Sequence, residues 1–150
     1  MNMKFINRII LLFGFCIYAL TSCNPDVIEV KNEKEIKKYL EDNNLQAEST
    51  SSGLYYIIAV PGTTEHPTVS DTVKISYTGT LLNGEEFDSS PSSTFPLAQL
   101  IDGMQEGIQL FGKGGEGTLI IPSELGYGGY PPPGIPVNAV LVFDIKLIDF

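Results

Sequence analysis

The chain has 150 residues, of which 9 are Lys or Arg and 18 are Asp or Glu, so its formal net charge is −9. This length predicts one domain with accessory segments. The acidic balance argues against nucleic acid as a partner, because such binding needs basic patches. Both cysteines, Cys16 and Cys23, lie near the N-terminus, and His66 is the single histidine. We therefore expect no disulfide in the folded part, no metal site and no cofactor.

The first 23 residues are typical of an export signal. Two basic residues precede a twelve-residue apolar run, Ile9 to Leu20, which suits a signal peptide and is short for a membrane span. The run ends in Leu20-Thr21-Ser22-Cys23, which resembles a bacterial lipobox. We predict a lipoprotein signal peptide at residues 1–22 and lipidation of Cys23. The mature chain would be anchored to a membrane of the cell envelope, facing the periplasm or the exterior. An ordinary cleavable signal with an incidental cysteine is the alternative.

Residues 23–52 are predicted to form a lipidated tether that contains a short helix. The helix is expected from Glu33 to Asp42, with Asn32 as its N-cap and acidic residues in its first turn. Its apolar stripe of Ile36, Tyr39 and Leu40 is narrow, which favours a docking or spacer helix. The polar stretch 43–53 is typical of a linker.

A β-hairpin follows. From Val73 to Thr78 apolar and polar residues alternate, which is typical of a half-buried strand. Asn83-Gly84 is a strong hairpin signal, because both residues tolerate positive φ. The returning limb ends on Phe87 and Asp88. The hairpin therefore brings Tyr77, a second ring and a carboxylate together, which suits an aromatic pocket without saying what the pocket binds.

The other elements complete an α+β domain over residues 53–150. One short helix is expected from Gln99 to Phe111, and two glycines in it predict close packing on a sheet. His66 lies in a polar loop and is interpreted as solvated, with a functional role as the minor alternative. Further strands are predicted at Leu54 to Val60, Thr118 to Pro122 and Val140 to Phe150.

Five ordered motifs resemble those of FKBP-type peptidyl-prolyl isomerases, and the similarity covers essentially residues 53–150. They are Val-x-Ile-x-Tyr77-Thr-Gly, then Asn-Gly-x-x-Phe87-Asp88-Ser-Ser, then Phe95-Pro-Leu with Leu100-Ile101-x-Gly103-Met104-x-Glu-Gly107, then Ile121-Pro-x-Glu-Leu-Gly-Tyr127-Gly, and finally Ile135-Pro-x-Asn-Ala-x-Leu-Val-Phe143-Asp. The resemblance implies a half-open antiparallel sheet wrapped around one short α-helix, with a shallow apolar pocket between them. The lipobox and the acidic helix are similar to lipoprotein members associated with gliding motility.

The resemblance also implies a site for proline-containing peptides and proteins. Substrate proline would lie on Met104, while the N–H of Ile101 and the hydroxyl of Tyr127 would hold substrate carbonyls. The implied catalytic residues are Tyr77, Asp88, Ile101, Tyr127 and Phe143. The implied substrate-binding residues are Phe87, Phe95, Leu100, Met104 and Ile135.

Two departures from the family pattern concern this site. Met104 stands where the family usually has Trp, which predicts weaker isomerase activity and weaker macrolide binding. The stretch between Asp88 and Phe95 is short and lacks the arginine that often pairs with the aspartate, so we expect Tyr77 to be the partner of Asp88. A membrane-anchored assembly factor or chaperone that binds proline peptides with little or no catalysis is the alternative function. A purely structural anchored domain is a third.

Overall fold

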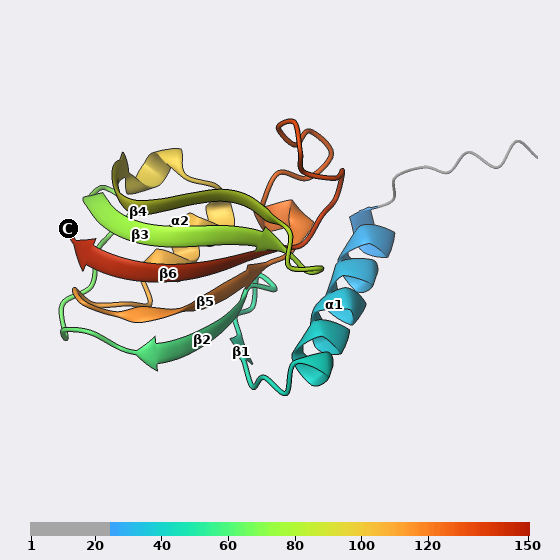
Figure 1. Ribbon diagram of the computed structural model, residues 1–150, viewed down its shortest axis with the longest axis horizontal. Helices are drawn as coiled ribbons and strands as arrows, with labels where there is room; N and C mark the ends of the chain where they lie inside the picture. The colour runs from blue at the N-terminus through green and yellow to red at the C-terminus, as the bar shows by residue number, and fades with distance from the viewer. Residues whose placement is uncertain (1–24) are drawn as a thin grey trace, which may run out of the picture.

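A computed structural model describes residues 25–150 of the chain, and the predicted signal peptide and Cys23 lie outside the described residues. Six antiparallel strands form one sheet in the order β1-β2-β5-β6-β3-β4 (Figure 1). The predicted α+β architecture, a half-open sheet around one short helix, is confirmed. The elements are α1 (Pro25–Asp42), β1 (Glu48–Ser49), β2 (Tyr55–Val60), β3 (Thr72–Leu81), β4 (Glu86–Pro96), the 3₁₀ turn η1 (Leu97–Gln99), α2 (Asp102–Ile108), β5 (Glu116–Ile121), the 3₁₀ turn η2 (Ser123–Leu125) and β6 (Leu141–Asp149).

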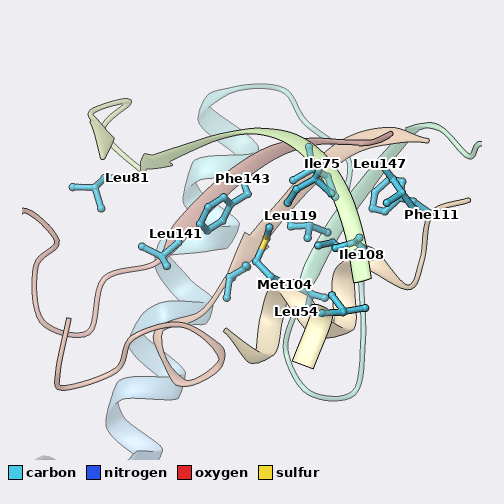
Figure 2. Packing of buried hydrophobic residues seen from close by; sticks show 14 residues of the cluster. Leu54, Ile75, Leu81, Met104, Ile108, Phe111, Leu119, Leu141, Phe143 and Leu147 are labelled. Carbon is cyan, nitrogen blue, oxygen red and sulfur yellow. The ribbon is translucent and has the colours of Figure 1, made fainter. Parts of the chain in front are cut away.

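The inner face of the sheet carries the larger core, and α2 packs on it (Figure 2). Two glycines let α2 approach closely: a Cβ on Gly103 would collide with Ile121, and one on Gly107 would collide with Leu119. Side chains of a strand alternate between its two faces, so one of every two residues of β6 points inward. These inward residues are Leu141, Phe143, Ile145 and Leu147, as the alternation predicts.

The outer face of the sheet carries a smaller core beneath α1. Ile36 of α1 is fully buried against Ile120 of β5 and Val142 of β6. These two strand residues lie next to inward-facing neighbours, so α1 and α2 cover opposite faces of the sheet. The helix is therefore docked on the domain and is not an isolated spacer.

Three boundaries differ from the predicted ones. The first helix begins at Pro25 and not at Glu33, so Asn32 lies in its interior and is not its N-cap. Proline is well suited to the first position of a helix, a signal the expectation overlooked. The second helix is limited to Asp102–Ile108 and is preceded by η1.

The third concerns residues 89–94, whose polar character and Pro91 predict a loop or an edge bulge; they belong to β4, so the loop is wrong and the irregular edge is present. β4 is an edge strand, where Pro91 removes no ladder hydrogen bond, and its register against β3 shifts between Ile75 and Tyr77. Over residues 25–150, no helix is long and apolar enough to cross a membrane.

Candidate active site

A cavity of about 250 Å³ opens between α2 and the inner face of the sheet. It is lined by all of the predicted catalytic and substrate-binding residues except Phe87 and Ile135. Two further lining residues, Ile75 and Gln99, were not predicted from the sequence. Its lining consists of Ile75, Tyr77, Asp88, Phe95, Gln99, Leu100, Ile101, Met104, Tyr127 and Phe143. Five segments far apart in the sequence thus meet in one mostly apolar hollow.

The aromatic wall of the cavity comes from β3, β4 and β6. The ring centroid of Tyr77 lies 6.2 Å from that of Phe95 and 6.2 Å from that of Phe143. Phe87 packs edge-on against Phe143, with centroids 5.5 Å apart, so it supports the wall from behind without lining the cavity. This packing requires Gly79, because a Cβ there would lie 2.7 Å from the Phe87 ring and 2.8 Å from the Phe143 ring.

Tyr77 and Asp88 form the polar part of the wall. The hydroxyl of Tyr77 donates a hydrogen bond of 2.8 Å to Asp88 Oδ2, so the expected partnership is present. Burial, with this hydrogen bond and the charge of Asp88, raises the pKa of Tyr77 to about 12. No lysine of residues 25–150 forms an ion pair with Asp88. The tyrosine is therefore the side chain that orients the carboxylate.

The start of α2 forms the floor of the cavity. Met104 is only 4% exposed and packs with Leu119 and Phe143 in the inner core (Figure 2). The carbonyl of Ile101 accepts the N–H groups of Met104 and Gln105, which begins the helix. The N–H of Ile101 makes no backbone hydrogen bond within the described part of the chain, so it can donate to a ligand.

Gln105 fixes the turn that precedes this floor. Its side-chain Nε2 donates 2.7 Å to the carbonyl of Leu100, so the backbone next to the Ile101 N–H is held in place. Sequence reasoning did not single out Gln105, because a glutamine in a short helix carries no signal of the carbonyl it will meet.

Tyr127 lies across the cavity from the sheet, just after η2. Tyr127 and Asp88 line the same cavity, and burial, with the charge of Asp88, raises the pKa of the Tyr127 phenol. Its hydroxyl has no hydrogen-bond partner among residues 25–150, so it is available to an acceptor of a ligand. Ile135, from the same loop, packs against the inner core but does not line the cavity.

A second cavity, of about 210 Å³, lies between α1 and the turn at residues 49–53. Three carboxylates, those of Glu29, Glu33 and Glu124, line it together with the hydroxyl groups of Ser49–Ser52. An apolar ligand would find less surface there, whereas the first cavity offers four aromatic rings. His66 lies in neither cavity, and its Nδ1 is 2.9 Å from the carbonyl oxygen of Gln109.

Comparison with known proteins identifies the family to which this geometry belongs. Residues 63–148 match the family described as FKBP-type peptidyl-prolyl cis-trans isomerase. The chain belongs to this family. It is 40% identical over 149 residues to the FKBP-type peptidyl-prolyl cis-trans isomerase FkpA of Aeromonas hydrophila, which covers 95% of this chain and 56% of that protein. The FkpA of Escherichia coli K12 is 41% identical over 125 residues, covering 81% of this chain and 46% of the relative.

The fold of this FKBP-family chain is also similar to solved structures. The crystal structure of FkpA from Escherichia coli has a TM-score of 0.72 and 40% identity, and the match covers 83% of this chain and 61% of that one. The crystal structure of AtFKBP13 gives a TM-score of 0.63 and 31% identity, with 69% and 98% covered. The chain spans about half the length of the curated relatives it matches.

Proposed function

We propose that this FKBP-family chain is a peptidyl-prolyl cis-trans isomerase that speeds rotation about X–Pro bonds of extracytoplasmic proteins. The observation that carries the proposal is the cavity above Met104, where four aromatic side chains surround a buried apolar floor. Beside it lie the N–H of Ile101 and the hydroxyl of Tyr127, neither of which is hydrogen-bonded within residues 25–150. Such a site suits a proline ring together with the carbonyl groups on either side of it.

The mechanism follows from amide resonance. Resonance gives the peptide bond a rotation barrier of about 18–20 kcal/mol. It also places negative charge on the amide oxygen, which water stabilises, and this charge separation is reduced when the bond twists. An apolar cavity deprives the planar amide of that solvation and so favours the twisted state, which is differential binding of the transition state. The rotation breaks no covalent bond and therefore needs no nucleophile and no proton transfer.

The residues have distinct proposed roles. Met104 supports the proline ring, and Phe95 and Phe143 exclude water from its sides. The N–H of Ile101 and the hydroxyl of Tyr127 donate hydrogen bonds to substrate carbonyls, which hold the chain on both sides of the rotating bond. Tyr77 holds Asp88 at the rim, where the carboxylate orients the substrate. Leu100, Phe87 and Ile135 complete and support the apolar surface.

The test is an isomerase assay, by NMR exchange or protease coupling, on the chain from residue 24 with Leu-Pro and Phe-Pro peptides. Tyr127→Phe is expected to lower kcat/KM about 3- to 10-fold, the effect of one hydrogen bond worth roughly 0.5–1.5 kcal/mol. Tyr130→Phe is the matched control, because Tyr130 is 96% exposed and lies three residues along the same loop. No acceleration at micromolar enzyme would remove the enzymatic proposal.

A second candidate is a proline-peptide-binding assembly factor or chaperone with little turnover, and Met104 favours it. Methionine is flexible, so it holds a substrate proline less firmly than the Trp usual in the family. In that case a proline peptide would bind with pocket-dependent affinity and isomerise slowly. Met104→Trp is then expected to raise the rate, while Met104→Leu, which conserves volume, is expected to leave it low. Macrolide binding is expected to be weak for the same reason, the replacement of Trp by Met104.

We further propose that residues 1–22 form a lipoprotein signal peptide and that lipidated Cys23 anchors residues 23–52 and the isomerase domain, 53–150, to an envelope membrane. The support is the lipobox and its position after the apolar run. Cys23→Ser is expected to move the chain from the membrane to the soluble fraction, and Cys16→Ser is the matched control. A role in gliding motility is a finer proposal, tested by motility of cells carrying Tyr127→Phe or Cys23→Ser.

A further inference from the structure

Asn32 is an unusual residue for the inside of a helix that packs on a sheet. It lies on the docked face of α1, one turn before Ile36, and is only 1% exposed. A buried amide costs free energy unless its donor and acceptor are both bonded. An apolar residue would be buried there without needing hydrogen-bond partners. The role of Asn32 therefore depends on the hydrogen bonds that it makes.

Both ends of the Asn32 amide bond the backbone of one loop. The N–H of Ser123 donates 2.7 Å to Asn32 Oδ1, and Asn32 Nδ2 donates 3.3 Å to the carbonyl of Asn138. Ser123 begins η2 just after β5, and Asn138 stands shortly before β6. A single side chain on α1 therefore joins the two ends of residues 123–138, which Figure 1 shows beside α1.

Two backbone hydrogen bonds within the loop meet at Gly128, the residue that follows Tyr127, and complete a ring with the two bonds of Asn32. The N–H of Gly128 donates 2.8 Å to the carbonyl of Ser123, and the N–H of Asn138 donates 2.9 Å to the carbonyl of Gly128. Gly128 has φ +52° and Asn138 has φ +57°, a region that most residues avoid. The backbone at Tyr127 is thus held by a network whose two outer ends converge on Asn32.

We infer that Asn32 is a positioning residue of the isomerase site. By fixing Ser123 and Asn138 it sets the place of Gly128, and through it the hydroxyl of Tyr127 across the cavity from Asp88. α1 is therefore part of the catalytic unit and not only a connection to the anchor. The catalytic consequence rests on the proposed function, whereas the clamp on the loop can be observed without it.

The experiment compares three variants of the full chain. Asn32→Leu removes both bonds at similar volume. Asn32→Asp keeps an acceptor for the N–H of Ser123 and removes the donor to Asn138. Ile36→Val is the matched control, because it deletes one buried methylene equivalent from the same face of α1 and leaves the network intact. Amide hydrogen exchange by NMR reads the loop, and kcat/KM on an X–Pro peptide reads the site.

In Asn32→Leu we expect exchange at Ser123, Gly128 and Asn138 to accelerate at least tenfold relative to β3 and β6, and kcat/KM to fall about 3- to 10-fold. In Asn32→Asp the N–H of Ser123 should stay protected while that of Asn138 exchanges faster. Ile36→Val should not lower kcat/KM, and it should not change amide exchange in the loop relative to the strands. Combining Asn32→Leu with Tyr127→Phe should cost little more activity than Tyr127→Phe alone.

Two results would overturn the inference. One is an Asn32→Leu or Asn32→Asp chain whose loop exchange equals that of the wild type. The other is an equal loss of activity in Asn32→Leu and Ile36→Val, which would mean that Asn32 only stabilises the fold. If the wild-type chain has no isomerase activity, the proposed function fails, yet the exchange data still decide whether Asn32 clamps the loop.

Discussion

The two faces of the sheet are built from the same strands but differ in what they bury. The inner face buries large side chains under a short helix and leaves a cavity lined by Tyr77, Phe95 and Phe143. The outer face buries a few aliphatic residues under α1 and forms a smaller cluster. The difference arises from helix length and reach: α2 is short and covers only part of the inner face, so aromatic rings remain open to a ligand.

The largest expected effect is on stability, and it should differ between two neighbouring residues of β6 that point to opposite faces of the sheet. Phe143→Ala is expected to lower the free energy of unfolding by about 3–5 kcal/mol, because it removes a buried ring that contacts both Tyr77 and Phe87. Val142→Ala, on the outer face, should cost about 1.6 kcal/mol for two methyl groups. Urea unfolding measures both. Equal losses would mean that the two faces contribute alike.

The next effect concerns the close approach of α2 to the sheet. Gly107→Ala should lower the free energy of unfolding by about 1–2 kcal/mol, because overpacking against fully buried Leu119 outweighs the better helix propensity of alanine. Gly129→Ala, where a Cβ meets nothing within 4 Å, should be close to neutral. Thermal unfolding of the two variants gives the comparison. A stabilised Gly107→Ala chain would show that helix propensity dominates there.

The inner face was predictable from sequence to a degree that the outer face was not. Alternation along β6 identified its inward residues, and the ordered motifs predicted the family and most of the cavity lining. Tyr77 could be placed because the alternation along its strand sets which way it points, whereas the place of Met104 was implied by the resemblance to the family. The pairing of Tyr77 with Asp88 followed from the lack of any other nearby partner.

The outer face depends on contacts between residues far apart in the chain. Asn32 resembled an N-cap by its local sequence, yet its amide bonds Ser123 and Asn138, about a hundred positions away. No periodic pattern in the sequence predicts such a pairing. Gln105 was missed for a different reason: its partner, the carbonyl of Leu100, is only five residues away, but it is defined only once the turn around Leu100 is in place. Gln99 was missed because nothing in its local sequence marks it as facing the cavity.

A smaller effect distinguishes Tyr77 from an ordinary surface tyrosine at alkaline pH. Its pKa is raised to about 12 by burial and by Asp88, whereas an unfolded tyrosine has a pKa of about 10. Between these values the folded phenol keeps a proton that the unfolded one has lost. Its contribution to stability is therefore fully present below about pH 10 and is lost as the pH rises through about 12.

Ultraviolet titration of tyrosinate in the wild type and in Tyr77→Phe isolates this group. Asp88→Asn should lower the pKa of Tyr77, because it removes a charge and weakens the hydrogen bond, but burial should keep that pKa above 10. Tyr130→Phe is the control for an exposed ring. If the tyrosinate signal lost in Tyr77→Phe titrates near pH 10, the partly buried, hydrogen-bonded state of Tyr77 is contradicted.

The smallest effect belongs to the part of the outer face that α1 leaves uncovered. There Lys146 Nζ lies 2.6 Å from Glu116 Oε1, with the side chains 53% and 45% exposed, on directly paired residues of β5 and β6. Because water screens exposed charges, Lys146→Gln should lower the free energy of unfolding by less than about 1 kcal/mol, and high salt should reduce the difference further. Lys34→Gln serves as the control, since residues 25–150 give Lys34 no ion-pair partner. A loss as large as that of Val142→Ala would mean that ion pairs, and not the apolar contact with α1, hold the outer face together.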